Sequence, residues 1–182
     1  MGIAQKSLVD TDQKLEERVT FMHERFGSAA IAEQYIEGRE LYVSVLGNDR
    51  LRVLPIWELQ FGGLPPGTIP IATEKMKFDI KYQERIGINQ GPADDLAPEL
   101  RNKIVKITKR ICRTLELDGY CRVDFRLTAE GVPYFLEANP NPEIAAHEVF
   151  AQAALRDGIK YPELMRRMVA LGISRANPKG LD

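Results

Sequence analysis

The sequence CRVDFRLTAEGVPYFLEANPNP, residues 121–142, decides how the chain is expected to fold. Apolar and polar residues alternate in both halves of it, which is typical of strands that bury one face and expose the other. Glu130-Gly131 separates the two halves and favours a short turn. The stretch therefore predicts a β-hairpin with one apolar and one polar face.

A two-residue turn at Glu130 and Gly131 would set the register of this hairpin. Residues that face each other directly in an antiparallel pair lie on the same face of the sheet. The expected partners are Ala129 with Val132, Phe125 with Leu136, Val123 with Ala138, Asp124 with Glu137, and Arg122 with Asn139. A slip of two residues would keep the faces and change the partners.

The polar face of the hairpin would bring the carboxylates of Asp124 and Glu137 opposite each other. Like charges directly opposite destabilise a sheet, so a compensating charge is expected. Arginine side chains such as Arg122 would provide it on a surface strand pair. A divalent cation would also provide it, because Mg²⁺ prefers oxygen ligands of the kind that Asp, Glu and Asn offer. The pattern leaves both interpretations open.

Length and composition limit the class of protein. The 182 residues are enough for one domain with a hydrophobic core or for two small lobes. A net charge of −1 argues against nucleic-acid binding driven by bulk charge. We find no apolar run long enough to span a membrane and no signal peptide, and two cysteines do not make a disulfide framework. We therefore expect a cytoplasmic protein with reduced thiols and with no nucleic-acid or membrane partner.

Periodicity and turn residues predict the elements before the hairpin. A helix is expected over residues 10–26, capped by Asp10-Thr11, ended by Gly27 and packed in the core through an apolar stripe. Strands are expected over 30–36, 41–46 and 51–58. A further helix should run from Pro98 to Asp118-Gly119. The two apolar stripes are Leu15, Val19, Met22 and Phe26, and then Leu100, Ile104, Ile107, Ile111 and Leu115.

Two helices are expected after the hairpin, over residues 145–156 and from Pro162 onward. Strands joined by tight turns indicate an α+β fold with antiparallel sheets rather than a doubly wound sheet. The chain contains neither a G-x-x-x-x-G-K-[ST] loop nor a G-x-G-x-x-G motif, so a nucleotide would be held without those phosphate-binding loops.

Residues 62–96 show no regular pattern, which in a compact domain often marks a lid or a binding loop. Basic residues alternate with apolar ones in the middle of this segment. A cationic flap that closes over a polyanion would have this composition. An amphipathic strand or short helix with a solvated basic face would have it too. The basic residues are Lys75, Lys77, Lys81 and Arg85.

Four separated stretches resemble one family, in the order that the family has them. They are EQYIEGRELYVSVLG at 33–47, KFDIKY at 77–82, the hairpin with its R-x-D and E-x-N-x-x-P motifs, and GIKYPEL at 158–164. Together they resemble the C-terminal part of the ATP-grasp domain of D-alanine–D-alanine ligases, over residues 2–171. The resemblance implies an α+β ATP-grasp fold with ATP held between two lobes. It also implies an ADP-forming ligase that joins a small-molecule carboxylate and an amine through an acyl phosphate.

The same resemblance implies a metal site and two catalytic residues. The acid of the R-x-D motif and the acid and amide of E-x-N would bind two Mg²⁺ ions, for which Mn²⁺ substitutes. In this sequence the metal ligands would be Asp124, Glu137 and Asn139. Arg122 would lie beside the reacting carboxyl group, and Lys81 matches the lysine of the lid.

Nucleotide-binding residues are also implied by the resemblance. The segment 33–40 is similar to the family's hinge around adenine and ribose. Tyr35, Ile36 and Glu33 would line the adenine edge, Glu40 would bind the ribose hydroxyls, and Leu136 would pack on the base, with Lys77 as a further nucleotide contact. Without the resemblance, the pattern favours solvated strand carboxylates as the interpretation of Glu33 and Glu40.

The resemblance divides the chain into segments and shows two departures from the family. Residues 1–60 would be a remnant of the first lobe with the hinge, 61–96 the lid, 97–176 the metal-binding lobe and 177–182 a tail. The first departure is at the start of the sequence. Gly2-Ile3 resembles only the end of the family's glycine-rich phosphate loop, so we expect the chain to be part of a longer ligase. A homodimer, if one forms, is expected through the full-length parent.

The second departure concerns the amine acceptor. Ligases of the family usually continue after E-x-N with a Gly-Met-Thr run that ends in His-Ser, where the serine helps to hold the acceptor's carboxylate. This chain has EIAAHE at 143–148, with acids in place of the glycine and the serine. The carboxylates of Glu143 and Glu148 would repel an acceptor carboxylate, which favours a different or cationic acceptor over D-alanine.

Three functional interpretations follow from the sequence. The first is the catalytic half of an ATP-grasp ligase. The second is a nucleotide-binding module that no longer catalyses. The third is a structural or interaction domain whose acidic strand pair binds a cation alone.

Overall fold

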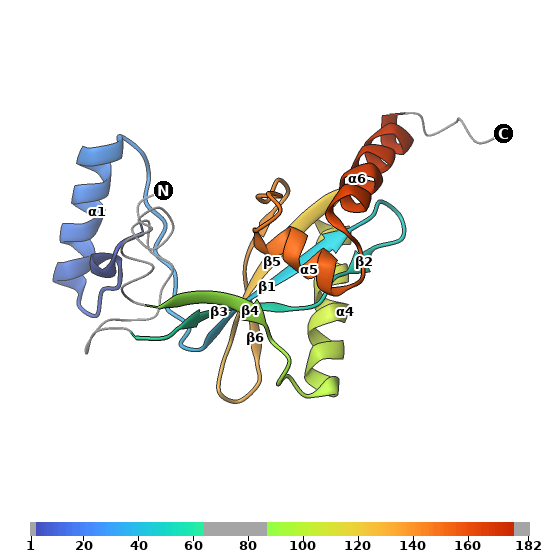
Figure 1. Ribbon diagram of the computed structural model, residues 1–182. Helices are drawn as coiled ribbons and strands as arrows, with labels where there is room; N and C mark the ends of the chain where they lie inside the picture. Colours follow the sequence, from blue (N-terminus) through green and yellow to red (C-terminus); the bar gives the residue numbers. More distant parts are fainter. Residues whose placement is uncertain (1–2, 64–86, 177–182) are drawn as a thin grey trace. The chain divides into compact units, whose positions relative to one another are not determined.

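The computed structural model describes residues 3–63 and 87–176, which form two compact units (Figure 1). The first unit comprises Met1–Ile36 and Phe61–Asn89, and the second comprises Glu37–Gln60 and Gln90–Asp182. Lys77 and Lys81, the lid interpretation of the surrounding segment and the predicted tail lie outside the described residues.

Within residues 3–63 and 87–176, the sheet contains six strands in the order β4-β3-β1-β5-β6, with β2 paired to β1 beside that path. The strands are β1 Arg39–Leu46, β2 Arg52–Val53, β3 Trp57–Phe61, β4 Ile88–Pro92, β5 Tyr120–Leu127 and β6 Pro133–Asn139. β1 runs antiparallel to β2, β3 and β5, and β5 runs antiparallel to β6. Arg39 anchors the start of β1 through hydrogen bonds to the carboxylates of Glu58 and Asp95. The predicted antiparallel α+β arrangement is confirmed.

The helices are α1 Asp12–Phe26, α4 Pro98–Thr114, α5 Val149–Arg156 and α6 Tyr161–Ala176, with a short 3₁₀ turn η1 at Gln5–Ser7. Thr11 caps α1, since its Oγ1 accepts a hydrogen bond from the Lys14 amide at 3.3 Å, and Gly27 ends it in the left-handed conformation. The expectation that the stripe of α1 packs in a core is wrong. α1 has no buried residue, and Phe26 is 47% exposed.

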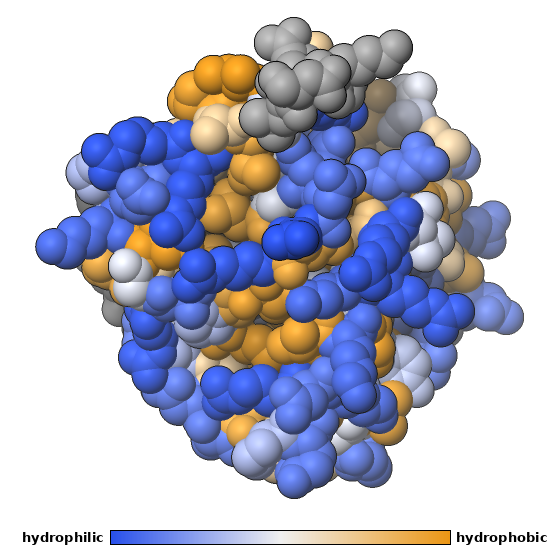
Figure 2. Space-filling model, turned by 90° about the vertical axis from the view of Figure 1, so that its right-hand side faces the viewer, coloured by the Kyte–Doolittle hydropathy of each residue, from blue (hydrophilic) through white to orange (hydrophobic). Residues whose placement is uncertain are grey.

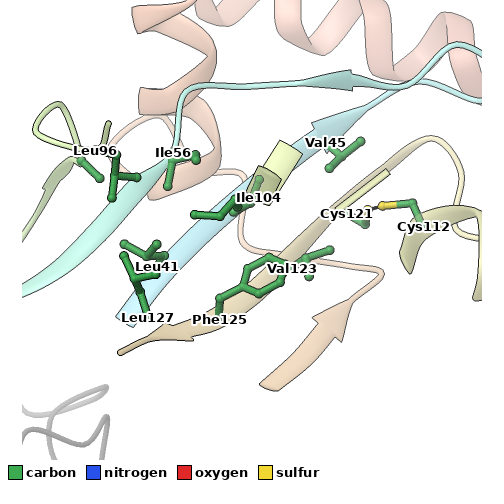
Figure 3. Packing of buried hydrophobic residues seen from close by; sticks show 12 residues of the cluster. Leu41, Val45, Ile56, Leu96, Ile104, Cys112, Cys121, Val123, Phe125 and Leu127 are labelled. Atoms are coloured by element: carbon green, nitrogen blue, oxygen red, sulfur yellow. Dashed lines mark hydrogen bonds between the residues drawn. The ribbon is translucent and has the colours of Figure 1, made fainter. Parts of the chain in front are cut away.

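The hydrophobic core lies between α4 and one face of β1 and β5 (Figure 3). Ile104 of α4 is completely buried against the alternate residues of the two strands, as its place in the predicted stripe requires. Leu115 is the exception, being 49% exposed, because α4 already ends at Thr114 and Glu116 adopts a positive φ of 54°. The strand residues of this core are Leu41, Val43, Val45, Cys121, Val123, Phe125 and Leu127.

The opposite face of β1 and β5 divides into a covered end and a polar end. α5 packs against β1, and the ring of Phe150 meets that of Tyr120 edge-on, with centroids 5.8 Å apart. Beyond this contact the face carries charged residues along β1, β5 and β6. Apolar surface also remains exposed within a border of hydrophilic side chains on the face that Figure 2 presents.

The hairpin of β5 and β6 has the predicted register at its open end only. Asp124 faces Glu137, Val123 faces Ala138 and Arg122 faces Asn139, as predicted. At the turn end the prediction is wrong. Phe125 faces Phe135 rather than Leu136, and Leu136 is the additional residue of a β-bulge.

The turn itself explains part of this difference. The Thr128 amide donates to the carbonyl of Val132 at 3.1 Å, so the loop holds three residues instead of two. A two-residue hairpin turn of the I′ type needs positive φ at both positions, but Gly131 has positive φ (76°) and Glu130 does not. Three-residue loops with a left-handed last residue are the next most common solution.

Four further predictions are wrong. Residues 30–36 form no strand. The expected strand 51–58 is split into β2 and β3, with Pro55, which lacks a backbone donor, between them. β4 lies in the segment predicted to be irregular, and the helix expected from residue 145 begins only at Val149.

Candidate functional site

The candidate site is the polar end of the sheet face formed by β1, β5 and β6. Strand alternation places every second residue on this face, and the register then sets neighbours across strands. Glu40, Tyr42 and Ser44 of β1 face Arg126, Asp124 and Arg122 of β5 in that order. Glu137 and Asn139 of β6 face Asp124 and Arg122 on the other side.

Asp124 and Arg122 form a bidentate ion pair at the centre of the site. Arg122 Nε lies 2.7 Å from Asp124 Oδ1, and its Nη2 lies 2.8 Å from Oδ2. Asp124 is only 4% exposed, and this burial raises the pKa of its carboxyl group, with smaller contributions from the charges of Glu137 and Glu40. The hydrogen bonds from Arg122 lower that pKa and oppose the effect. The compensating arginine predicted for the acidic pair is therefore present as a direct contact.

Glu137 differs from its partner across the hairpin. Its side chain is exposed, and no described residue donates a hydrogen bond to it. Asn139, two residues along the same face, accepts a hydrogen bond at Oδ1 from the Asn141 amide at 2.9 Å. An amide oxygen has two lone pairs, so this bond leaves Asn139 with acceptor capacity.

A cation–π contact and a hydrogen bond together link the ion pair to Glu40. The Arg122 guanidinium lies 4.6 Å from the centre of the Tyr42 ring, and the Tyr42 hydroxyl donates to Glu40 Oε1 at 2.9 Å. Glu40 Oε2 forms an ion pair with Arg126 Nη2 at 2.9 Å. Burial, followed by the charges of Glu40 and Asp124, raises the pKa of Tyr42 well above its usual value.

Tyr42 and Arg126 were not predicted as members of the site. The signal for them was nevertheless in the sequence, since each lies two residues from a predicted site residue on the same strand. Period-two alternation puts such residues on one face. Their exact partners depend on the pairing of β1 with β5, and in the described residues β2, β3, β4 and α4 lie between those two strands in the sequence.

The other predicted residues lie in different parts of the chain. Glu33, Tyr35 and Ile36 belong to the first unit, in an irregular segment where Glu33 is exposed and the other two are half-buried. Leu136 belongs to the second unit and is 42% exposed at the bulge. The structure therefore brings together Glu40, Arg122, Asp124, Glu137 and Asn139 of the predicted set.

Acidic residues follow the hairpin, as the sequence shows. His147 is largely exposed, and its Nε2 lies 3.6 Å from Glu148 Oε1. Within residues 3–63 and 87–176, no group of three or more His, Cys, Asp or Glu side chains is arranged to hold a metal. The predicted metal ligands are not a group of that kind, because they are two carboxylates and one amide. No helix in the same ranges has the length and apolar character of a membrane span.

Comparison with known proteins identifies relatives over nearly the whole chain. A D-alanine–D-alanine ligase of Desulfotalea psychrophila is 31% identical over 95% of this chain and 51% of its own length. An uncharacterized protein, y4sG, of Sinorhizobium fredii is 30% identical over 96% of the chain and 50% of its own length. The chain thus spans about half the length of these curated relatives.

A solved structure and a family model agree with these relatives. The D-alanine–D-alanine ligase of Bacillus anthracis, solved in complex with ATP, superposes with a TM-score of 0.73 at 20% identity, over 94% of this chain and 50% of that one. This similarity shows the ATP-grasp fold, as predicted. A family model described as the D-ala D-ala ligase C-terminus matches residues 3–170. The chain therefore belongs to the D-alanine–D-alanine ligase C-terminal family.

Proposed function

We propose that this chain is the ATP- and Mg²⁺-binding part of an ADP-forming carboxylate–amine ligase that acts through an acyl phosphate. The observation that carries the proposal is the facing pair Asp124 and Glu137 with Arg122 beside it, in a chain of this family. A relative solved with ATP supports the nucleotide. ATP as a substrate and two free cysteines support a cytoplasmic setting.

The residues present fit a magnesium site. Asp124, Glu137 and Asn139 are hard oxygen donors at neighbouring positions on one sheet face, where cross-strand partners have Cβ atoms roughly 5 Å apart. Glu137 has oxygens open to solvent, whereas both oxygens of Asp124 currently bind Arg122. When bound, Mg²⁺ would neutralise the charge of the phosphate groups during phosphoryl transfer.

The chain's own residues would then divide the remaining work. Arg122 is held by Asp124 and by the ring of Tyr42, so its guanidinium is oriented before substrate binds and can stabilise the oxyanion formed at the acyl carbon. Glu40, fixed between Tyr42 and Arg126, would accept hydrogen bonds from the ribose hydroxyls.

Residues from other parts of the chain complete the proposed nucleotide site. Lys81 would contact the phosphates and exclude water, with Lys77 as a further contact. Glu33, Tyr35 and Ile36 would bind adenine, and Leu136, exposed at the bulge, would pack on the base.

Calorimetric titration with a non-hydrolysable ATP analogue tests this proposal, with and without Mg²⁺. Glu137→Ala should abolish the Mg²⁺-dependent part of binding in this chain or in its full-length parent, and the fold should be unchanged. Glu130→Ala is the matched control, because it removes an exposed carboxylate from the turn of the same hairpin. An unchanged Mg·ATP affinity in Glu137→Ala would refute the site.

The acidic residues after the hairpin favour an acceptor other than D-alanine. Glu143 is exposed and Glu148 lies beside His147, so the local charge suits a cationic amine better than a carboxylate. ADP release by the full-length parent, measured with D-alanine and with diamines or basic amino acids, would distinguish these acceptors. Mg·ATP binding without ADP release for any carboxylate and amine would instead identify a non-catalytic nucleotide-binding module.

A further inference from the structure

The two cysteines of the chain lie next to each other in the core, although they belong to different elements. Cys112 lies near the end of α4 and Cys121 is the second residue of β5. Their sulfur atoms are 3.5 Å apart, and both thiols are free (Figure 3). Forming a disulfide bond would require the sulfurs to approach by about 1.5 Å, since that bond is about 2.05 Å long.

A surface pocket lies directly over Cys112. It has a volume of about 410 Å³ and is lined by the β1–β2 connection and by the end of α4, including Asn48, Arg113 and Asp118 as well as Cys112. Cys112 itself has no exposed surface and Cys121 has almost none. A small polar reagent can therefore enter the pocket, but it reaches the thiols only when the end of α4 opens locally.

We propose that Cys112 and Cys121 form a redox-sensitive dithiol, which a peroxide entering through this pocket converts into an intramolecular disulfide. The inference does not depend on the proposed ligase function, because it concerns the opposite face of β5 from the acidic pair. Cys121 faces α4, whereas Arg122 and Asp124 face away from it.

The reaction proceeds in two balanced steps. The Cys112 thiolate attacks one oxygen of hydrogen peroxide, the O–O bond breaks, and hydroxide leaves and takes up the proton released by the thiol, so that a sulfenic acid and one water result. The Cys121 sulfur then attacks the Cys112 sulfur, an S–S bond replaces the S–O bond, and a second water leaves with the Cys121 proton. Two thiols lose two electrons, and one peroxide is reduced to two waters.

The order of attack follows from access to the pocket. Cys112 lines the pocket and Cys121 does not. The contact between the two sulfur atoms favours the same order, because it lowers the pKa of Cys112 and, together with burial, raises the pKa of Cys121. Cys112 is therefore the residue that peroxide oxidises first, and Cys121 is the resolving residue.

Mass spectrometry of the reduced chain after graded peroxide treatment tests the proposal. After quenching with N-ethylmaleimide, the native protein should lose both alkylatable thiols together and yield a cross-linked peptide pair, and dithiothreitol should restore both thiols. This measurement uses the wild-type protein, so its outcome does not depend on whether a substituted protein folds. Absence of the cross-link, with sulfinic or sulfonic acids or only intermolecular disulfides in its place, would overturn the proposal.

Single substitutions separate the two roles. In Cys121→Ala, dimedone should trap a sulfenic acid on Cys112. In Cys112→Ala, the same treatment should modify Cys121 at least several-fold more slowly. Equal labelling in the two variants would refute the assigned order. Oxidation that occurs only after unfolding in urea would refute the access route through the pocket.

Discussion

Tyr42→Phe removes a single hydroxyl from the buried network and leaves the ring in place. That hydroxyl donates to Glu40 Oε1 at 2.9 Å, and the two residues are 6% and 8% exposed. Glu40 is paired with Arg126, so the lost bond is one to a charged acceptor in a nearly dry site. Such bonds contribute about 1.5–3 kcal/mol, and we expect the free energy of unfolding to fall by that amount.

Ser44→Ala is the matched control for this change. Ser44 lies two residues further along the same face of β1 and is completely buried, and its hydroxyl has no hydrogen-bond partner in the part of the chain that the structure describes. Removing a buried hydroxyl without a partner should change the free energy of unfolding by less than about 0.5 kcal/mol, or raise it. The two substitutions remove the same chemical group from one strand and differ in whether that group is bonded.

Urea denaturation followed by circular dichroism measures both free energies of unfolding. Equal slopes of free energy against urea concentration would show that the unfolded states of the variants are alike. A double-mutant cycle with Glu40→Gln isolates the coupling of the pair. Tyr42→Leu should cost roughly 0.5–2 kcal/mol beyond Tyr42→Phe, because it also removes the ring under Arg122. If Tyr42→Phe is as stable as the wild type, or Ser44→Ala is as costly as Tyr42→Phe, the network does not hold the site as described.

Three further predictions concern the fold around the site. Ile104→Ala should lower the free energy of unfolding by about 2–5 kcal/mol, because the residue is fully buried. Val169→Ala is the control, since that side chain is 63% exposed, and it should lower the free energy of unfolding by less than about 0.5 kcal/mol. Thermal or urea unfolding measures both. Gly38→Ala should fold poorly, since its Cβ would lie 2.1 Å from a β5 carbonyl oxygen. Gly119→Ala should fold and be only mildly destabilised, because its Cβ would have open space and only its positive φ is unfavourable for alanine. Circular dichroism distinguishes the two outcomes. Asp95→Asn should be less stable than the wild type at neutral pH. The Arg39 guanidinium beside Asp95 lowers the pKa of that carboxyl below its usual value of 3.8. The ion pair therefore stabilises the folded protein above pH 3.8, and this stabilisation is lost as the pH falls through the lowered pKa. Denaturation curves of the two proteins should therefore converge in acid, and a constant difference at all pH values would contradict this.

Local patterns predicted the elements whose burial follows their own periodicity. α4 follows its stripe through Ile104 and Ile111, and β1 and β5 follow their alternation. The stripe of α1 carries the same signal, yet no residue of α1 is buried, because periodicity reports an apolar face and not what covers it. The split of the expected strand at Pro55 could have been predicted, since proline cannot donate to the ladder.

The candidate site was predicted less completely than the fold. The predicted pairing of Asp124 with Glu137 is correct, but the turn and the straight strand from which it was predicted are not. The loop is one residue longer than predicted and the bulge at Leu136 adds one residue to β6, so the two differences cancel at the acidic pair. The contacts of Tyr42 depend on long-range pairing between β1 and β5, which no local pattern specifies.

The bulge has a consequence for how this hairpin tolerates change. Because Leu136 lies between the turn and the acidic pair, the length of the loop does not by itself determine which carboxylates face each other. A one-residue deletion in the loop could be absorbed by straightening β6, with Asp124 still opposite Glu137. The hairpin can therefore accumulate insertions and deletions at its tip during evolution, or accept grafted loops in engineering, while the chemistry at its base is preserved.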